Sequence, residues 1–154
     1  MDILRKIRHL IIGGGAIDKG LETILHGFPN AVWNTYGMTE TLSHIALRRI
    51  SGEDATDYYT PFDNITVSQD ENGCICIDAP KICNSILHTN DIAEFHPDGR
   101  RFRIIGRKDN VINSGGIKIH IEEMENRLAP YMNHEFAITK KEDKKLGEKV
   151  VMIV

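Results

Sequence analysis

Hydrophobic positions in the first third of the chain predict a strand, a helix and a second strand. The apolar run at residues 10–12 is ended at once by three glycines, which predicts a short buried strand over residues 9–12. Apolar side chains then recur at helical spacing over residues 18–26, and Gly27 is a typical helix terminator. Residues 31–33 form the next apolar run. This order predicts the end of an α/β sheet domain, to which we assign residues 1–57.

Short alternating runs from about Tyr58 onward predict antiparallel β structure. Turn-forming residues separate the runs at 70–73 and 97–99, as expected for hairpins. The sequence therefore predicts a small antiparallel β-barrel subdomain over residues 58–107. The runs themselves lie at 65–67, 74–77, 93–95 and 102–105.

A charged break at residues 108–110 predicts a hinge, because it has no apolar period and separates two differently patterned regions. Beyond it, residues 111–119 are typical of a glycine-tipped hairpin, and residues 121–128 carry a helical stripe that Pro130 ends. Residues 111–154 therefore indicate the start of a small α+β C-terminal domain. Further strands are expected at 136–138 and 150–154, and a solvated charged turn at 140–145.

Composition and charge exclude several classes of function. The 154 residues carry 19 basic and 22 acidic side chains, a formal net charge of -3, which gives no reason to expect nucleic-acid binding. No apolar run approaches the roughly 20 residues of a membrane helix, and no secretory leader is visible. Cys74, Cys76 and Cys83 fit neither an even disulfide set nor a metal pattern, so we expect a cytoplasmic protein. Cys74 and Cys76 share one face of a predicted strand, where burial is favoured over metal binding.

Residues 34–41 place a hydroxyl beside a carboxylate on a glycine turn. The Thr39 hydroxyl could bond a phosphoryl oxygen, Glu40 supplies the oxygen ligand that Mg²⁺ prefers, and Gly37 lets the backbone come close. An ordinary helix N-terminus, with Thr39 as the cap and Glu40 as a first-turn acid, explains the same residues. The run by itself leaves both interpretations open.

Five short motifs are spaced along the chain. They are Gly13-Gly14-Gly15, Tyr36-Gly37-Met38-Thr39-Glu40-Thr41, Thr89-Asn90-Asp91, Gly106-Arg107-Lys108-Asp109 and Ser114-Gly115-Gly116. Their identity and order resemble the adenylate-forming superfamily of acyl-CoA ligases, peptide-synthetase adenylation domains and luciferases. The resemblance implies that ATP, with Mg²⁺, adenylates a small carboxylic acid to an acyl-AMP, and that the acyl group then passes to coenzyme A.

The resemblance also implies roles for individual residues. Tyr36 would lie against the adenine, Asp91 would accept hydrogen bonds from both ribose hydroxyls, and Arg107 would be a second ribose ligand. Thr39 would hold the α-phosphate and Glu40 the metal, which makes them the catalytic pair. The residues implied to bind the nucleotide are Gly13, Gly14, Gly15, Asn34, Thr35, Tyr36, Gly37, Asp91 and Arg107.

Several of these assignments have a plainer alternative. The glycines, implied to pass beside the adenine, could form a tight turn without a ligand. Asp91 could be a turn acid, and a lone Arg107 could be solvated. Asn34 is implied to reach the amino edge of the adenine. Asn90 stands where the family usually has glycine, and the turn is expected to persist because asparagine tolerates a left-handed backbone.

Asp109 falls where the family has the pivot of its small domain, which rotates between an adenylating and a thioester-forming pose. By resemblance, Ser114, Gly115 and Gly116 form the loop that swings toward the active site, with Lys118 as a further contact for coenzyme A. The glycines also simply make a hairpin, and that structural role is expected in either case.

Thr41, Ser43 and His44 are expected to face the acyl pocket. The glycine triplet, the Ser43-His44 pair and residues 114–119 are most similar to the 2-succinylbenzoate-CoA ligases of menaquinone biosynthesis, which implies o-succinylbenzoate as the acid. Another aryl or acyl carboxylate fits nearly as well.

The resemblance covers nearly the whole chain, but the chain covers less than half of the family's length. The family's phosphate-binding loop is not found before Leu10, and its C-terminal lysine is expected beyond Val154. We therefore expect a ligase fragment that is inactive by itself and self-associates through exposed apolar edges. The alternative is a complete short nucleotide-binding or interaction module without catalysis.

Overall fold

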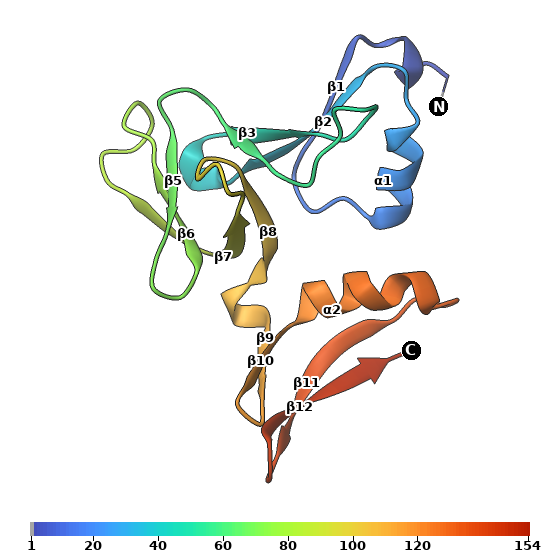
Figure 1. Cartoon of the computed structure of the whole chain (residues 1–154), viewed down its shortest axis with the longest axis vertical. Coiled ribbons are helices and arrows are strands. Elements are labelled where there is room, and N and C mark those ends of the chain that lie inside the picture. The colour runs from blue at the N-terminus through green and yellow to red at the C-terminus, as the bar shows by residue number, and fades with distance from the viewer. Residues whose placement is uncertain (1) are drawn as a thin grey trace.

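Three four-stranded sheets follow one another along the chain in a computed structural model that describes residues 2–154 (Figure 1). In the first sheet, β1 and β2 run parallel and are joined by helix α1, whereas β3 and β4 add antiparallel to β2. The predicted strand-helix-strand unit is thereby confirmed. Its elements are β1 (His9–Ile12), α1 (Lys19–His26), β2 (Ala31–Gly37), β3 (His44–Arg49) and β4 (Thr60–Pro61).

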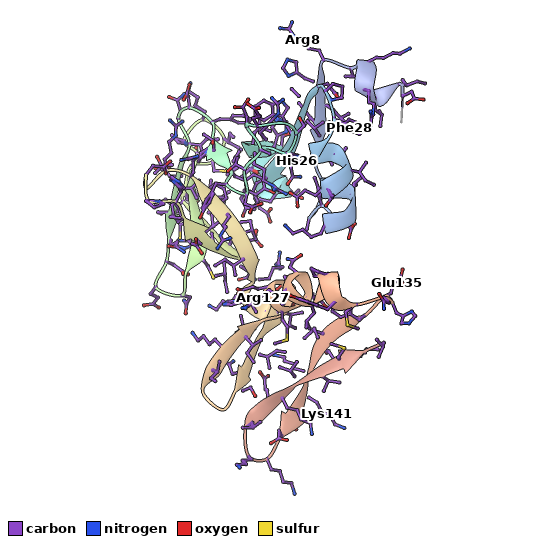
Figure 2. The ribbon with its side chains drawn as sticks, turned by 45° about the vertical axis from the view of Figure 1, so that its right-hand side comes forward. Arg8, His26, Phe28, Arg127, Glu135 and Lys141 are labelled. Carbon is purple, nitrogen blue, oxygen red and sulfur yellow. The ribbon has the colours of Figure 1, made fainter. Side chains whose placement is uncertain are left out.

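Local signals define α1 and its packing. The Asp18 side chain accepts a hydrogen bond from the Leu21 N–H (3.1 Å), which caps the first turn, and the helix ends before Gly27. The buried side chains of Leu25 and Phe28 then pack with two strand-side residues, Val32 and Ile50, into a small core. In Figure 2, Phe28 lies beside α1, whereas Arg127 and Lys141 mark the C-terminal part of the chain below.

The second sheet is a curled half-barrel of four antiparallel strands, in the order β5-β6-β7-β8, and confirms the predicted antiparallel β structure. Its core surrounds the fully buried Phe102 and also takes in Ile45 and Ala46 from β3. Cys74 and Cys76 are buried in β6, as predicted. The strands are β5 (Thr66–Gln69), β6 (Cys74–Asp78), β7 (Leu87–Phe95) and β8 (Phe102–Arg107).

The third sheet, in the order β10-β9-β12-β11, follows a single 3₁₀ turn at Lys108–Asn110. Helix α2 lies on the side of this sheet that faces the rest of the molecule, where it contacts β8 and β11 (Figure 1). The predicted glycine-tipped hairpin and the predicted helix are both present. The elements are β9 (Val111–Ser114), β10 (Ile117–His120), α2 (Ile121–Leu128), β11 (Ala137–Asp143) and β12 (Gly147–Ile153).

The structure departs from the sequence-based expectations in four elements. The strand at 9–12 was expected to be buried, but β1 is an edge strand with no buried residue. The turn expected at Asn90, with Asp91 as a possible turn acid, is also wrong, because both residues lie within the continuous strand β7.

Strand β3 was not expected, because Ile45 and Ala46 are buried consecutively and break the alternation that marks a half-exposed strand. The expected turn at 140–145 is wrong for its first four residues, which extend β11 and pair with β12. Charged side chains are common on such an edge strand, because they point to solvent. Among residues 2–154, no helix is long and apolar enough to cross a membrane.

Candidate nucleotide-binding site

Three predicted site residues from separate parts of the sequence meet where β2 approaches the half-barrel. Asp91 on β7 and Arg107 on β8 lie 16 positions apart but are direct cross-strand partners. Arg107 Nη1 donates to Asp91 Oδ1 (3.2 Å), and the Tyr36 hydroxyl donates to Asp91 Oδ2 (2.7 Å). The chain therefore folds so that a tyrosine, a carboxylate and a guanidinium converge at one place.

The protonation of this cluster suits the recognition of hydroxyl groups. Burial, followed by the hydrogen bond to Asp91, raises the pKa of Tyr36 well above its ordinary value, so its hydroxyl stays a donor. Each oxygen of the Asp91 carboxylate accepts one bond from the protein and keeps a second lone pair. A carboxylate held in this way can accept hydrogen bonds from two neighbouring ribose hydroxyls, so this cluster of side chains fits a nucleotide.

The exposure of Arg107 separates a binding role from a purely structural one. The Asp91 side chain is 15% exposed, whereas that of Arg107 is 54% exposed. An ion pair with a half-exposed partner contributes about 0–1 kcal/mol to stability. Stability alone therefore gives little reason for this arginine to sit opposite Asp91.

The Tyr36 ring packs against two aromatic side chains of the core. Its centroid lies 5.4 Å from that of Phe102, edge to face, and 5.9 Å from that of Tyr59. These contacts support the ring from the core side of the half-barrel. Its predicted contact with an adenine face stays a prediction.

Asn34, two residues earlier on β2, has a different setting from the one its predicted role implies. The residue is fully buried, and its Nδ2 donates to the Ile12 carbonyl (3.1 Å). Its Oδ1 accepts bonds from Arg48 Nε (3.2 Å) and from the Tyr59 hydroxyl. The structure places this amide inside the protein, so its contact with an adenine amino group stays a prediction.

The glycine segment after β1 lies beside β2. Gly14 has φ +96°, which favours glycine, and a Cβ on Gly13 would overlap the Thr35 hydroxyl. Gly15 has neither constraint, because its φ is ordinary and no atom lies within 4 Å of the position that a Cβ would take. The fold therefore explains two of the three glycines and leaves the third to be explained.

Gly15→Ala tests the predicted passage of this segment beside a nucleobase. We expect its free energy of unfolding to change by less than about 0.5 kcal/mol, because the site is exposed and unstrained. We expect its affinity for AMP to fall, because the added methyl group stands between the backbone and the base. Gly14→Ala is the control that should lose stability through its positive φ. Unchanged AMP affinity in Gly15→Ala, measured by calorimetric titration, would favour the ligand-free turn.

The turn after β2 exposes the predicted catalytic pair. Thr39–Thr41 form one 3₁₀ turn in which Thr41, not Thr39, supplies the capping hydroxyl. Thr41 Oγ1 accepts a bond from the Met38 N–H (3.0 Å) and donates to the Ser43 carbonyl (2.7 Å). Thr39 and Glu40 are exposed. The alternative of Thr39 as a helix cap is wrong, because Met38 holds the cap position, whereas Glu40 is an acid in the first turn, as that alternative also predicted.

The structure shows how the expected acyl-pocket residues are arranged without testing that role. Thr41 is buried within its turn, whereas Ser43 and His44 are exposed. Ser43 Oγ lies 3.0 Å from His44 Nδ1, and the His44 ring lies 5.6 Å from that of Phe62. Two cavities, lined by residues 5–9 with 29–31 and by 129 with 132–136, contain no predicted site residue. The candidate site is therefore defined by converging side chains and not by a cavity.

The chemistry of Glu40 fits a metal that is shared with phosphate groups. Within residues 2–154, no three His, Cys, Asp or Glu side chains gather in a way that could hold a metal by themselves. Mg²⁺ commonly binds through one or two carboxylates together with the phosphates of its substrate. An exposed Glu40 beside Thr39 is compatible with that mode of binding.

The predicted hinge connects the half-barrel with α2. Asp109 Oδ2 accepts a bond from Asn90 Nδ2 (3.2 Å) on β7. Next to it, Asn110 Nδ2 donates to Glu122 Oε1 (2.6 Å) in the first turn of α2, and Glu122 also lies against Gly106. The turn at Lys108–Asn110 is thus hydrogen-bonded both to β7 and to α2. The role of Asp109 as a pivot stays a prediction.

The predicted coenzyme A loop is the turn between β9 and β10. Gly115 and Gly116 take φ values of +58° and +86°, and the Gly115 N–H donates to the Leu146 carbonyl (2.8 Å). Figure 1 shows this turn at the end of the third sheet that is farthest from β2. The turn, which begins at Ser114, therefore lies away from β2, and Lys118 is exposed on β10. Their contact with coenzyme A stays a prediction that requires a rotation of this part.

Two residues beside the site were not identified from the sequence. Arg48 and Tyr59 both bond to Asn34, and Tyr59 also packs on Tyr36. A signal for Arg48 was present, because a charged residue in the apolar run that follows His44 needs a partner if the run is buried.

Comparison with solved structures gives proteins that share this fold. An acyl-CoA synthetase (AMP-forming)/AMP-acid ligase II-like protein from Dyadobacter fermentans is 35% identical, with a TM-score of 0.64, over 94% of this chain. E. coli MenE with a bound analogue of OSB-AMS is 22% identical, with a TM-score of 0.77, over 96% of this chain. Bacillus subtilis O-succinylbenzoate coenzyme A synthetase (MenE), in complex with ATP and magnesium ion, is 20% identical, with a TM-score of 0.72, over 98% of this chain.

The matches cover only part of each of those proteins. The aligned region is 42% of the D. fermentans protein, 36% of E. coli MenE and 38% of the B. subtilis protein. No protein-family profile matches the chain. No curated protein matches it either. The structural neighbours are thus AMP-forming acyl-CoA synthetases, and this chain spans about two fifths of their length.

Proposed function

We propose that the chain is part of an ATP-dependent acid-thiol ligase that adenylates a carboxylic acid and passes the acyl group to coenzyme A. The observation that carries this proposal is the convergence of Tyr36, Asp91 and Arg107, because it brings together an aromatic ring, a diol acceptor and a cation from three separate motifs. Similarity to AMP-forming acyl-CoA synthetases, one of them 35% identical, supports it.

In the first step, a carboxylate oxygen of the acid attacks the α-phosphorus of ATP. The bond from that phosphorus to the bridging oxygen breaks, and pyrophosphate leaves with the electron pair. Asp91 and Arg107 hold the ribose, and the exposed Thr39 hydroxyl donates to an α-phosphate oxygen. Glu40 would hold Mg²⁺, which would supply positive charge to the phosphates.

In the second step, the thiol of coenzyme A attacks the acyl carbon of the adenylate. The carbon–sulfur bond forms as the bond to the AMP oxygen breaks, the thiol proton passes to solvent, and AMP leaves with the electron pair of the broken bond. We assign the β9–β10 turn, with Ser114, Gly115, Gly116 and Lys118, to this step. Since that turn lies far from β2, the strand that carries Tyr36, in Figure 1, the step requires a rotation about the segment containing Asp109.

We propose o-succinylbenzoate as the acid. Two structural neighbours are MenE proteins, one of them with a bound analogue of OSB-AMS. Ser43 and His44 are exposed just after the catalytic turn and offer polar groups to a dicarboxylate. Another aryl or acyl carboxylate would use the same nucleotide site.

Asp91→Ala tests the proposed function directly. The chain is titrated with AMP, with ATP and Mg²⁺, and with a non-hydrolysable acyl-adenylate analogue of o-succinylbenzoate. A hydrogen bond to a charged group contributes about 1.5–3 kcal/mol, so the variant should bind each ligand roughly 10–100-fold more weakly.

The same strands provide a matched control for this titration. Glu94 pairs across the strands with Arg103 (2.8 Å) and accepts a bond from the Tyr58 hydroxyl (3.1 Å), which reproduces the chemistry of the Asp91 cluster at an exposed position. Glu94→Ala should leave nucleotide affinity unchanged. Equal losses in both variants, or no nucleotide binding by the unmodified chain, would contradict the proposal.

A further inference from the structure

Arg48 is a charged side chain buried in the first sheet, beside the candidate site. Its side chain is 10% exposed, and its Nη1 lies 2.6 Å from Glu22 Oε1 on α1. Burial alone raises the pKa of Glu22, but the Arg48 charge and hydrogen bond bring the net pKa below its ordinary value, so the pair is ionised. Nη1 also donates to the Thr56 carbonyl (3.4 Å). A buried guanidinium is costly unless it is paired in this way.

Arg48 is connected to the glycine segment through the side chain of Asn34. Arg48 lies opposite Asn34 in the register of β2 and β3, and its Nε donates to Asn34 Oδ1. The amide orientation follows from chemistry, because arginine can only donate and the Ile12 carbonyl can only accept. Asn34 Nδ2 therefore donates a hydrogen bond to the carbonyl of Ile12, the residue immediately before Gly13.

Arg48 is also connected to Tyr36, through the ring of Tyr59. The guanidinium carbon lies 5.5 Å from the ring centre of Tyr59, a distance typical of cation–π contact. Tyr59 bonds to Asn34 through its hydroxyl and packs against the Tyr36 ring. The Arg48 side chain thus contacts Asn34, which is bonded to the residue before the glycine segment, and Tyr59, which packs against Tyr36.

We propose that Arg48 is a positioning residue that fixes the spacing between the segment 13–15 and Tyr36, and thereby the slot for a nucleobase. This inference rests on the proposed nucleotide site. Three contacts in different directions, to Glu22, Asn34 and Tyr59, need a planar group with several fixed donors. A lysine ammonium keeps the charge but cannot make all three in that geometry, so its substitution should loosen the slot.

The test compares Arg48→Lys with the unmodified chain in binding AMP and ribose 5-phosphate, which carries a hydroxyl at C1 where AMP carries the base. Since stacking of a base contributes about 1–3 kcal/mol, we expect AMP affinity to fall about tenfold and ribose 5-phosphate affinity less than about twofold. Arg49→Lys is the matched control. Arg49 lies on the same strand but bonds to Ser51 (3.0 Å) and stacks over Trp33.

A second variant guards against a general loss of structure. Glu22→Gln keeps the size of the side chain and one acceptor for Arg48, so it weakens the contact between residues 22 and 48 without removing it. We expect its AMP affinity to lie between those of the unmodified chain and Arg48→Lys, with ribose 5-phosphate affinity again preserved. Far-ultraviolet circular dichroism confirms that each variant is folded at the titration temperature.

The outcomes separate this inference from the proposed function. If the unmodified chain binds AMP and Arg48→Lys weakens both ligands equally, or neither, the positioning role is overturned and the nucleotide site remains. If the unmodified chain binds no AMP, the proposed function is overturned and the inference with it. A selective loss of AMP affinity in Arg48→Lys, absent in Arg49→Lys, supports the inference.

Discussion

Phe102→Ala is expected to lower the free energy of unfolding by about 3–5 kcal/mol, the usual cost of deleting a buried phenylalanine ring. Phe102 has no exposed surface and is the largest fully buried side chain. Its ring lies 5.4 Å from Tyr36, 5.7 Å from Tyr59 and 6.1 Å from Phe95, measured between centroids. The neighbouring aromatic rings cannot close the resulting cavity without moving out of their own contacts, so little of the loss is recovered.

The same substitution should weaken the candidate site. Tyr36 is supported edge to face by Phe102, and Tyr59 exchanges two main-chain hydrogen bonds with Phe102 (2.7 and 3.1 Å). The position of the Tyr36 hydroxyl against Asp91 therefore depends on this ring, and AMP affinity should fall together with stability.

Phe62→Ala is the control, because Phe62 is 36% exposed and lies outside this cluster. We expect it to cost less than about 2 kcal/mol, since less apolar area is removed from burial. Urea denaturation of both variants, followed by circular dichroism, gives the comparison. Equal losses of unfolding free energy would show that Phe102 is not the centre of the half-barrel core.

Local signals explain which elements could be predicted from the sequence. Helix α1 has an N-terminal Asp18, a helical apolar spacing and a C-terminal Gly27, all of which act within a few residues. Strand β3 has no such local signal. Ile45 and Ala46 are both buried because one sheet curls into the next, and no pattern within β3 contains that information.

The candidate site shows the same division. The order of the motifs predicted Asp91 and Arg107, but their pairing depends on a register shift between Ile92 and Ala93 that only the folded sheet reveals. Tyr36 was predicted to act through its ring face. Its hydrogen bond to Asp91 joins residues 55 positions apart, and a contact at that separation is fixed by tertiary packing.

Asn34 is predicted to contact a ligand, and the structure shows its amide bonded within the protein. Its amide joins the end of β1 to Arg48 and Tyr59, in a buried position of β2. A polar residue in a short strand can contact a ligand or bond within the protein, and the sequence does not report the burial that brings its internal partners together. For the same reason Arg48, its partner, was not identified from the sequence.

Gly37→Ala is expected to lower the free energy of unfolding by about 3 kcal/mol, at the upper end of the usual cost of overpacking. Gly37 sits at a register shift between β2 and β3, where the two backbones approach closely. A Cβ at this position would overlap the Ser43 carbonyl and the His44 Cα, and would lie 2.9 Å from the Ser43 carbonyl carbon. Main-chain atoms cannot rotate away as a side chain can, so the strands must separate.

That separation would displace the turn that carries Thr39 and Glu40, because the turn connects β2 to β3. We therefore expect Gly37→Ala to lose affinity for ATP with Mg²⁺ by a larger factor than for AMP, since the proposed site assigns the phosphates and the metal to this turn and the ribose to Asp91. Gly15→Ala is the control for stability, because no atom lies within 4 Å of its added methyl group. Urea denaturation and parallel titrations measure both effects. A Gly37→Ala protein as stable as Gly15→Ala would mean that β2 and β3 are not held this close in solution.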